Sequence, residues 1–207
     1  MTHIPTPWPS PQILDQLVQN SSGYFVYAST IIKFVDDEYF RPSRQLDIII
    51  QKFVPHPFAA LDQLYIQILS AVPSRHYPIL YDILSVIIHL PAYLSAEEME
   101  DLLGLEPGDV SLILRPLHSV LALRSDRGVE VHHASFRDFL GNQQRSSNFY
   151  VGSPQHRAKV AGSFLRALAY KYEDQQKNAK RHGFRGYIHH IVKCHQFFIL
   201  LFVGSSQ

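Results

Sequence analysis

The 207-residue sequence predicts a mainly α protein, in which a helical subdomain is followed by a winged-helix-like subdomain with one β-hairpin. Three observations support this prediction. Apolar residues recur at the i, i+3, i+4 spacing of helices through most of the first 120 residues. Residues 121–131 alternate like two short strands around Gly128, a residue that suits a tight hairpin turn. Residues 129–140 then pass from strand period to helix period, so a strand leads directly into a helix.

Composition and charge favour a soluble, cytoplasmic protein. With 46% hydrophobic and 18% charged residues, the chain has enough apolar material for a core. A net charge of +1 gives no reason to expect nucleic acid or a membrane as a partner. The only cysteine, Cys194, excludes an internal disulfide framework and fits a reducing compartment. No secretory signal precedes the first helix, and the most apolar run, residues 197–203, is too short to span a membrane.

Residues 1–57 form the predicted helical subdomain. Four prolines among the first eleven residues predict that no helix begins before Gln12. A first helix follows through residues 13–18. Residues 24–35 are apolar nearly all round, which predicts a helix buried on most sides. A short helix at 41–50 precedes the Pro-His-Pro segment, residues 55–57, which we take as the boundary of the subdomain.

Residues 58–150 form the predicted winged-helix-like subdomain. Its order is helix, helix, helix, hairpin and short helix. Ser95 and Glu98 make a capping box for one helix, and Gly104 is placed to end it. Asp109 is expected to cap the helix that follows. The remaining helices are expected at residues 61–69, 76–90 and 109–121.

The strand at Val129 leads into the last helix of this subdomain. Ser135 stands at the expected N-cap, and Asp138 has the carboxylate that a capping box uses to reach back. After a loop at 145–153, residues 151–172 contain a further helix that starts near His156. Residues 173–207 form a divergent tail without a clear apolar face, which we expect to be poorly ordered.

Several motifs resemble those of fungal NACHT-domain proteins, which are signalling ATPases (STAND NTPases) related to NOD-like receptors. The resemblance covers residues 8–170 and implies that residues 24–35 belong to the helical subdomain that closes a nucleotide-binding module. It also implies that residues 133–140 belong to the winged helix behind that module. The matching motifs are WPS at 8–10, SSGYFVYASTIIKFVDDEYFRP at 21–42, FAALDQLYIQIL at 58–69, HASFRDFL at 133–140 and RSSNFYV at 145–151.

The sequence departs from that family in one essential feature. No glycine is followed by lysine, so the GxxxxGK[ST] phosphate loop of a NACHT domain is absent. We therefore expect no enzymatic activity and no cofactor. The resemblance then implies a regulatory arm of a NACHT-type ATPase, or a truncated fragment of one. Its expected partners are other proteins or the missing nucleotide-binding half.

His133 is the one candidate functional residue. The resemblance implies that the winged-helix histidine donates a hydrogen bond to the β-phosphate of ADP and holds the closed, inactive state. In a chain without a phosphate loop, a histidine satisfied locally at a strand end is the simpler interpretation. His132 points the other way by strand alternation and is the weaker candidate.

Two alternatives have less support. A winged helix can bind DNA through its third helix, but residues 109–121 offer only Arg115 and His118 as polar readers, and Glu106 precedes them. Packing within the protein is therefore the favoured role of this helix. A metal site at His190 and Cys194, with their histidine neighbours, lacks the paired ligands from a second segment that zinc frameworks show. The sequence contains no HExxH, CxxC or GxSxG motif.

Overall fold

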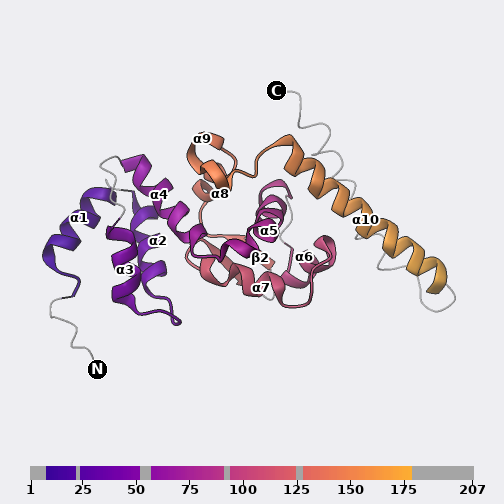
Figure 1. Ribbon diagram of the computed structural model, residues 1–207, viewed down its shortest axis with the longest axis horizontal. Helices are drawn as coiled ribbons and strands as arrows, with labels where there is room; N and C mark the ends of the chain where they lie inside the picture. Colours follow the sequence, from indigo (N-terminus) through magenta and orange to yellow (C-terminus); the bar gives the residue numbers. More distant parts are fainter. Residues whose placement is uncertain (1–7, 22–23, 52–56, 91–93, 125–127, 179–207) are drawn as a thin grey trace.

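The computed structural model describes residues 8–21, 24–51, 57–90, 94–124 and 128–178. Within these ranges the chain is mainly helical, with one two-stranded antiparallel sheet (Figure 1), which confirms the predicted fold class. None of the described helices combines the length and the hydropathy that crossing a membrane requires.

The first three helices form a group at the N-terminal end, which we call the helical unit (Figure 1). They are α1 (Pro11–Ser21), α2 (Phe25–Val35) and α3 (Pro42–Ile50). Both α1 and α3 begin at a proline, which is tolerated there because the first N–H groups of a helix have no intrahelical acceptor. The expectation that no helix starts before Gln12 was therefore wrong by one residue.

Helix α4 (Pro57–Ser70) joins the helical unit to the rest of the protein. It packs against α1, α2 and α3 and also against η2 (Arg115–Leu117) and α9 (Gln143–Ser146). The elements from η1 to α8 form what we call the winged-helix unit. Their bounds are η1 Ser74–His76, α5 Tyr77–His89, α6 Ala96–Leu103, α7 Asp109–Leu114, η2 Arg115–Leu117, β1 Leu121–Arg124, β2 Gly128–Val131 and α8 Ala134–Leu140.

A single hydrophobic core runs through both units. It extends from Tyr27 and Phe34 in α2, through α4, to Phe136 in α8 and Val160 in α10 (Pro154–Asn178). At its centre the Tyr65 ring of α4 lies 5.0 Å from the Phe136 ring, measured between centroids. The core is thus continuous where the sequence predicts a boundary between subdomains, and α4 provides the continuity.

The local sequence signals of helix α6 and of the hairpin are confirmed. Ser95 Oγ accepts from the Glu98 N–H at 3.1 Å and Glu98 Oε2 accepts from the Ser95 N–H at 2.9 Å, so the capping box is complete. Gly104 ends α6 with a φ of 69°. Gly128 has a φ of 79°, and a Cβ there would lie 2.3 Å from the Leu94 carbonyl oxygen. Only glycine fits that position.

Three predicted segments differ in the structure. The helix expected at 109–121 ends at Leu114, because Pro116 lacks an N–H and the chain tightens into η2 before β1 begins. The loop expected at 145–153 instead contains α9 (Gln143–Ser146) and η3 (Ser147–Phe149), with Asn142 as the cap of α9. Helix α10 runs over Pro154–Asn178 and so extends past residue 172, where the sequence predicts that the helix ends and the tail begins. The rest of the tail lies outside the described residues.

A buried carboxylate fixes the start of α7. Asp109 does not cap this helix: Gly108 is the N-cap residue, and the carboxylate comes from Glu100 in α6. Glu100 Oε1 accepts from the N–H groups of Gly108 and Val110, both at 3.0 Å, and Glu100 is 6% exposed. A negative group at a helix N-terminus satisfies N–H groups that have no intrahelical acceptor.

We predict that Glu100→Ala lowers the free energy of unfolding by ~2 kcal/mol, since the buried N–H of Val110 and the partly buried N–H of Gly108 lose a charged acceptor. Asp101→Ala, an exposed neighbour on the same helix, is the control and should change it by less than ~0.5 kcal/mol. Urea denaturation of the three proteins measures both effects. Equal stability of the two variants would contradict the assigned role of Glu100.

Candidate functional site

His133 lies where β2 ends and α8 begins, and its ring is exposed. Its Nδ1 accepts a hydrogen bond from the Ser135 N–H at 3.1 Å and lies 2.8 Å from Ser135 Oγ. His133 is therefore the N-cap of α8. The predicted N-cap at Ser135, with Asp138 completing a capping box, was wrong, because an imidazole nitrogen supplies the acceptor instead of a serine oxygen.

The cap determines which nitrogen of His133 is available. A backbone N–H can only donate, so Nδ1 accepts, and the proton of the neutral ring lies on Nε2. Nε2 makes no hydrogen bond within the described residues. The site thus presents one N–H donor on a fixed ring, which is the group that a phosphate oxygen accepts from.

The ring is anchored to the core through Ser135 and Tyr65. Ser135 Oγ lies 2.7 Å from the hydroxyl oxygen of Tyr65. Because Nδ1 of His133 accepts, the Ser135 hydroxyl donates to it and the Tyr65 hydroxyl donates to Ser135. Burial raises the pKa of Tyr65, and its hydrogen bond to Ser135 offsets this only in part, so the phenol remains protonated and able to donate. The result is a chain of hydrogen bonds from the centre of the core to the exposed histidine.

The same side of α4 also holds α9 in place. Asp62, three residues before Tyr65, forms a two-pronged ion pair with Arg145, in which Nη2 donates to Oδ1 at 2.7 Å and Nε donates to Oδ2 at 3.0 Å. Residues three apart lie on one side of a helix, so α4 positions both α8 and α9 from a single surface. Such bidentate pairs are the more strongly oriented kind of ion pair.

A second group of histidines connects the winged-helix unit to the helical unit. His118 Nε2 lies 2.8 Å from the carbonyl oxygen of Lys33, near the C-terminus of α2, and must donate to it. His118 Nδ1 faces Oδ2 of the buried Asp37 at 3.5 Å. The other oxygen of Asp37 accepts from the Tyr39 N–H at 2.8 Å. A protonated His118 would therefore donate to both a helix C-terminus and a carboxylate.

His132 supports this junction and takes no part in the His133 site. Its Nε2 donates to the carbonyl oxygen of His118 at 3.0 Å. Burial, more than any other cause, lowers the pKa of His132, so the neutral ring is favoured. The structure thus turns the two neighbouring histidines toward different partners, as strand alternation predicts.

The two residues considered as DNA readers are both engaged within the protein. The Arg115 guanidinium lies 3.6 Å from the centroid of the Tyr39 ring, a cation–π contact, and His118 is bound to α2. Arg115 lies in η2 and His118 directly follows it, and both side chains contact the helical unit. Neither of these two side chains is therefore without contacts inside the protein.

The sequence indicated His133 but not the residues that position it. In the sequence, Ser135 indicates only a cap, and Tyr65 is only one position of the helix expected at 61–69; the two residues are 70 apart. The one available signal was a tyrosine on a buried helical face, since a buried hydroxyl requires a partner. The metal hypothesis at His190 and Cys194 concerns residues that lie outside the described ranges. Among the described residues, no group of His, Cys, Asp and Glu could hold a metal ion.

Comparison of the chain with protein-family models, with curated proteins and with solved structures finds no match.

We predict that the protein is less stable in mild acid because two histidines are held neutral. Burial is the main cause that lowers the pKa of both His89, which donates to the Val151 carbonyl oxygen at 2.9 Å, and His132. Their pKa in the folded protein is below the ordinary 6.5, so below that pH the unfolded chain binds more protons. The free energy of unfolding should fall as the pH drops from 7.5 to 5.5.

Urea denaturation at pH 7.5, 6.5 and 5.5 tests this. The variant His89→Gln with His132→Gln keeps an N–H donor at each position and does not titrate, so its stability should depend less steeply on pH than that of the wild type. Identical pH slopes of the two proteins would show that neither histidine contributes.

Proposed function

We propose that this chain is the helical and winged-helix arm of a NACHT-type signalling ATPase and acts in the cytoplasm through protein contacts, without catalysis. The observation that carries the proposal is the uneven distribution of exposed hydrophobic side chains. Among the described residues, most of the large exposed ones belong to the helical unit and the loops beside it. These are Trp8, Leu14, Val18, Tyr24, Phe25, Ile32, Tyr39, Phe40 and Ile48.

Helix α2 contributes two of the three most exposed of these side chains. Phe25 is 83% and Ile32 67% exposed, and because they are seven residues apart they lie on one side of the helix, two turns from each other. The expectation that this helix is buried on most sides therefore holds only for its inner side, where Tyr27, Ile31 and Phe34 are buried. Exposed apolar side chains gathered on one part of a soluble protein are typical of an interaction surface.

The resemblance to NACHT proteins identifies the partner in this proposal. In that family the helix corresponding to α2 closes the nucleotide-binding module, so the exposed side of α2 is where a nucleotide-binding half would pack. The geometry of His133 supports the same assignment, because its free Nε2–H is a donor held on a rigid corner. No phosphate loop occurs in the sequence, so the ATPase chemistry would belong to the partner.

DNA binding, the second candidate, has less support. The third helix of a DNA-binding winged helix must offer its polar side chains to the major groove. Here Arg115 and His118 contact Tyr39 and Lys33 of the same protein, and the net charge of the chain is +1.

We predict that the purified chain self-associates and binds a dye that reports exposed apolar surface, such as anilinonaphthalene sulfonate. In Phe25→Ser with Ile32→Ser, dye fluorescence should fall by at least half and light scattering should shift toward the monomer, because the main apolar surface of α2 is removed. Leu165→Ser, an exposed leucine on α10, serves as the control. A wild-type chain that is monomeric and does not bind the dye would contradict the proposal.

We predict that His133 retains ADP when the chain is joined to the nucleotide-binding half of a NACHT protein. His133→Asn keeps an acceptor for the cap of α8 but removes the Nε2–H donor. Loss of a hydrogen bond to a charged phosphate should weaken ADP binding by ~1.5–3 kcal/mol, or about 10- to 150-fold.

The measurement is the release rate of a fluorescent ADP analogue from the fused protein. His132→Asn is the matched control, because His132 binds His118 and does not face the site. Equal release rates in the wild type and His133→Asn would reduce His133 to a structural cap.

A further inference from the structure

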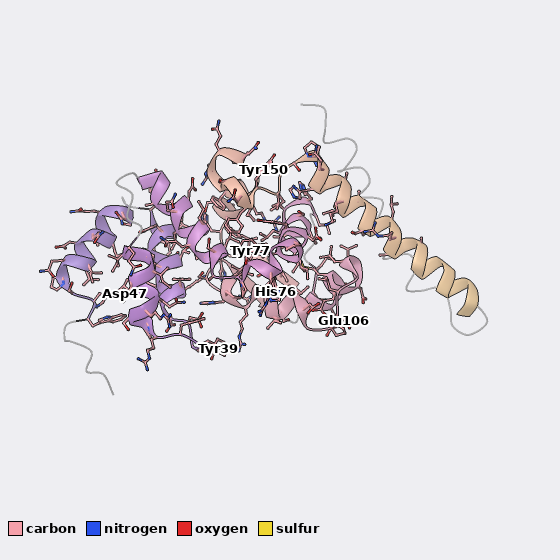
Figure 2. The ribbon with its side chains drawn as sticks, in the orientation of Figure 1. Tyr39, Asp47, His76, Tyr77, Glu106 and Tyr150 are labelled. Atoms are coloured by element: carbon pink, nitrogen blue, oxygen red, sulfur yellow. The ribbon has the colours of Figure 1, made fainter. Side chains whose placement is uncertain are left out.

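A cleft of about 960 Å³ lies between the helical unit and the winged-helix unit. We call it the β1 cleft, because strand β1 forms one wall from Leu121 to Arg124; α7 and η2 form the second wall, and the loop at 36–39 after α2 forms the third. Figure 2 labels Tyr39 on this loop, at the lower edge of the molecule. The cleft is separate from the exposed ring of His133, which is not part of its lining.

The backbone of β1 has an open edge in this cleft. The edge of β2 that faces away from β1 is hydrogen-bonded, because the Val129 N–H donates to the Leu94 carbonyl oxygen at 2.8 Å. Val129 is opposite Leu123, so these two residues form a pair whose backbone groups point away from each other. The N–H and C=O of Leu123 therefore point out of the sheet on the β1 side.

The same argument applies to Leu121, two residues earlier and opposite Val131. Among the described residues, neither Leu121 nor Leu123 makes a backbone hydrogen bond on this edge. Leu121 is buried but Leu123 is 41% exposed, so access to the edge is through the Leu123 end. An unpaired strand edge of this kind offers hydrogen-bonding groups to another strand.

The rim of the cleft is apolar. Tyr39, Leu112 and Leu123 are all more than one-third exposed, and they come from the three separate walls. Side chains on three sides can contact alternate residues of an extended chain, because every second side chain of a strand points the same way.

The charges in the cleft leave a negative balance. Its lining holds three carboxylates, Asp36, Asp37 and Glu38, and two guanidinium groups, of which Arg115 lies on the Tyr39 ring and Arg124 pairs with Glu130 at 3.3 Å. Two acidic side chains of the lining, Asp36 and Glu38, are exposed and form no ion pair within the described residues. A ligand that complements this cleft is therefore basic.

We propose that the β1 cleft binds an extended peptide segment of a partner protein, which adds to β1 as a third antiparallel or parallel strand and carries alternating apolar and basic residues. Main-chain hydrogen bonds to Leu123 provide affinity, the apolar rim takes the apolar side chains, and the two free carboxylates select lysine or arginine. Because the walls of the cleft come from both units, a bound peptide also holds the two units together. The proposal rests on the sheet edge and not on the proposed function.

The test uses the full 207-residue chain and a fluorescently labelled eight-residue peptide of alternating lysine and valine, with alternating glutamate and valine as the reference peptide. We expect saturable binding of the lysine peptide by fluorescence anisotropy and at least tenfold weaker binding of the glutamate peptide. By NMR, the Leu123 amide should shift and exchange more slowly with solvent in the complex, since its N–H is then hydrogen-bonded.

Two variants separate the contributions. Asp36→Asn with Glu38→Gln should weaken binding by about three- to tenfold and reduce its dependence on salt, as expected for two exposed ion pairs. Asp101→Asn with Glu106→Gln removes one aspartate and one glutamate that do not line the cleft, and should bind like the wild type. Leu123→Pro deletes the outward N–H without removing a hydrogen bond of the hairpin, and should abolish the amide-dependent binding.

Three results would overturn the proposal: no binding of the lysine peptide up to millimolar concentration, equal binding by both pairs of acidic variants, or binding without any change at the Leu123 amide. Preferential binding of a short DNA duplex at the same residues would also overturn it. The paired charge variants lie on the surface, so this outcome does not depend on whether Leu123→Pro folds.

Discussion

The hydroxyl of Tyr65 is the constraint on which the arrangement of this protein depends. Its ring is buried at the centre of the core, packed against Phe136 and Phe139, and a buried hydroxyl without a partner is costly. Ser135 supplies that partner and thereby fixes the first turn of α8 against α4. The position of His133 follows, because the same serine also bonds its ring. The hydrogen bond that satisfies the buried Tyr65 hydroxyl therefore also fixes the orientation of the candidate site.

The junction between the two units, unlike the core, is polar. On the side of the β1 cleft the units meet through polar contacts: His118 with Lys33 and Asp37, and Arg115 with Tyr39. A winged helix used for DNA recognition keeps the corresponding surface free. Here the third helix ends at Leu114, and Arg115 and His118, which follow it, contact the neighbouring unit. These two polar side chains therefore take part in packing within the protein.

Sequence reasoning succeeded where the signal is local. The capping box at Ser95, the positive φ of Gly128 and the period of the longer helices each depend on residues within one or two turns, so they could be predicted. The acceptor at the start of α7, the cap of α8 and the helix α9 were missed. In each case several local solutions were open, and tertiary contacts selected one: Glu100 starts α7 from another helix, and Asp62 holds α9 from 83 residues away.

The candidate site likewise has one part that local sequence signals predict and another part that depends on tertiary contacts. His133 was found because a motif includes it, but its free nitrogen could be identified only after the cap was known. The polar junction was missed because its partners, His118 and Lys33, are 85 residues apart and neither belongs to a recognisable pattern. Periodicity reports which residues are buried; it does not report which polar groups meet.

The two kinds of contact between the units, the apolar core and the polar junction, differ in the free energy needed to break them. Through α4 the units share a continuous apolar core, and opening it would expose large side chains such as Tyr65 and Phe34 to water. At the polar junction, by contrast, the contacts include one hydrogen bond from His118 to the carbonyl of Lys33 and the approach of His118 to Asp37. A hydrogen bond of this kind contributes only about 0.5–1.5 kcal/mol. The apolar core about α4 therefore contributes more than the polar junction to holding the two units together.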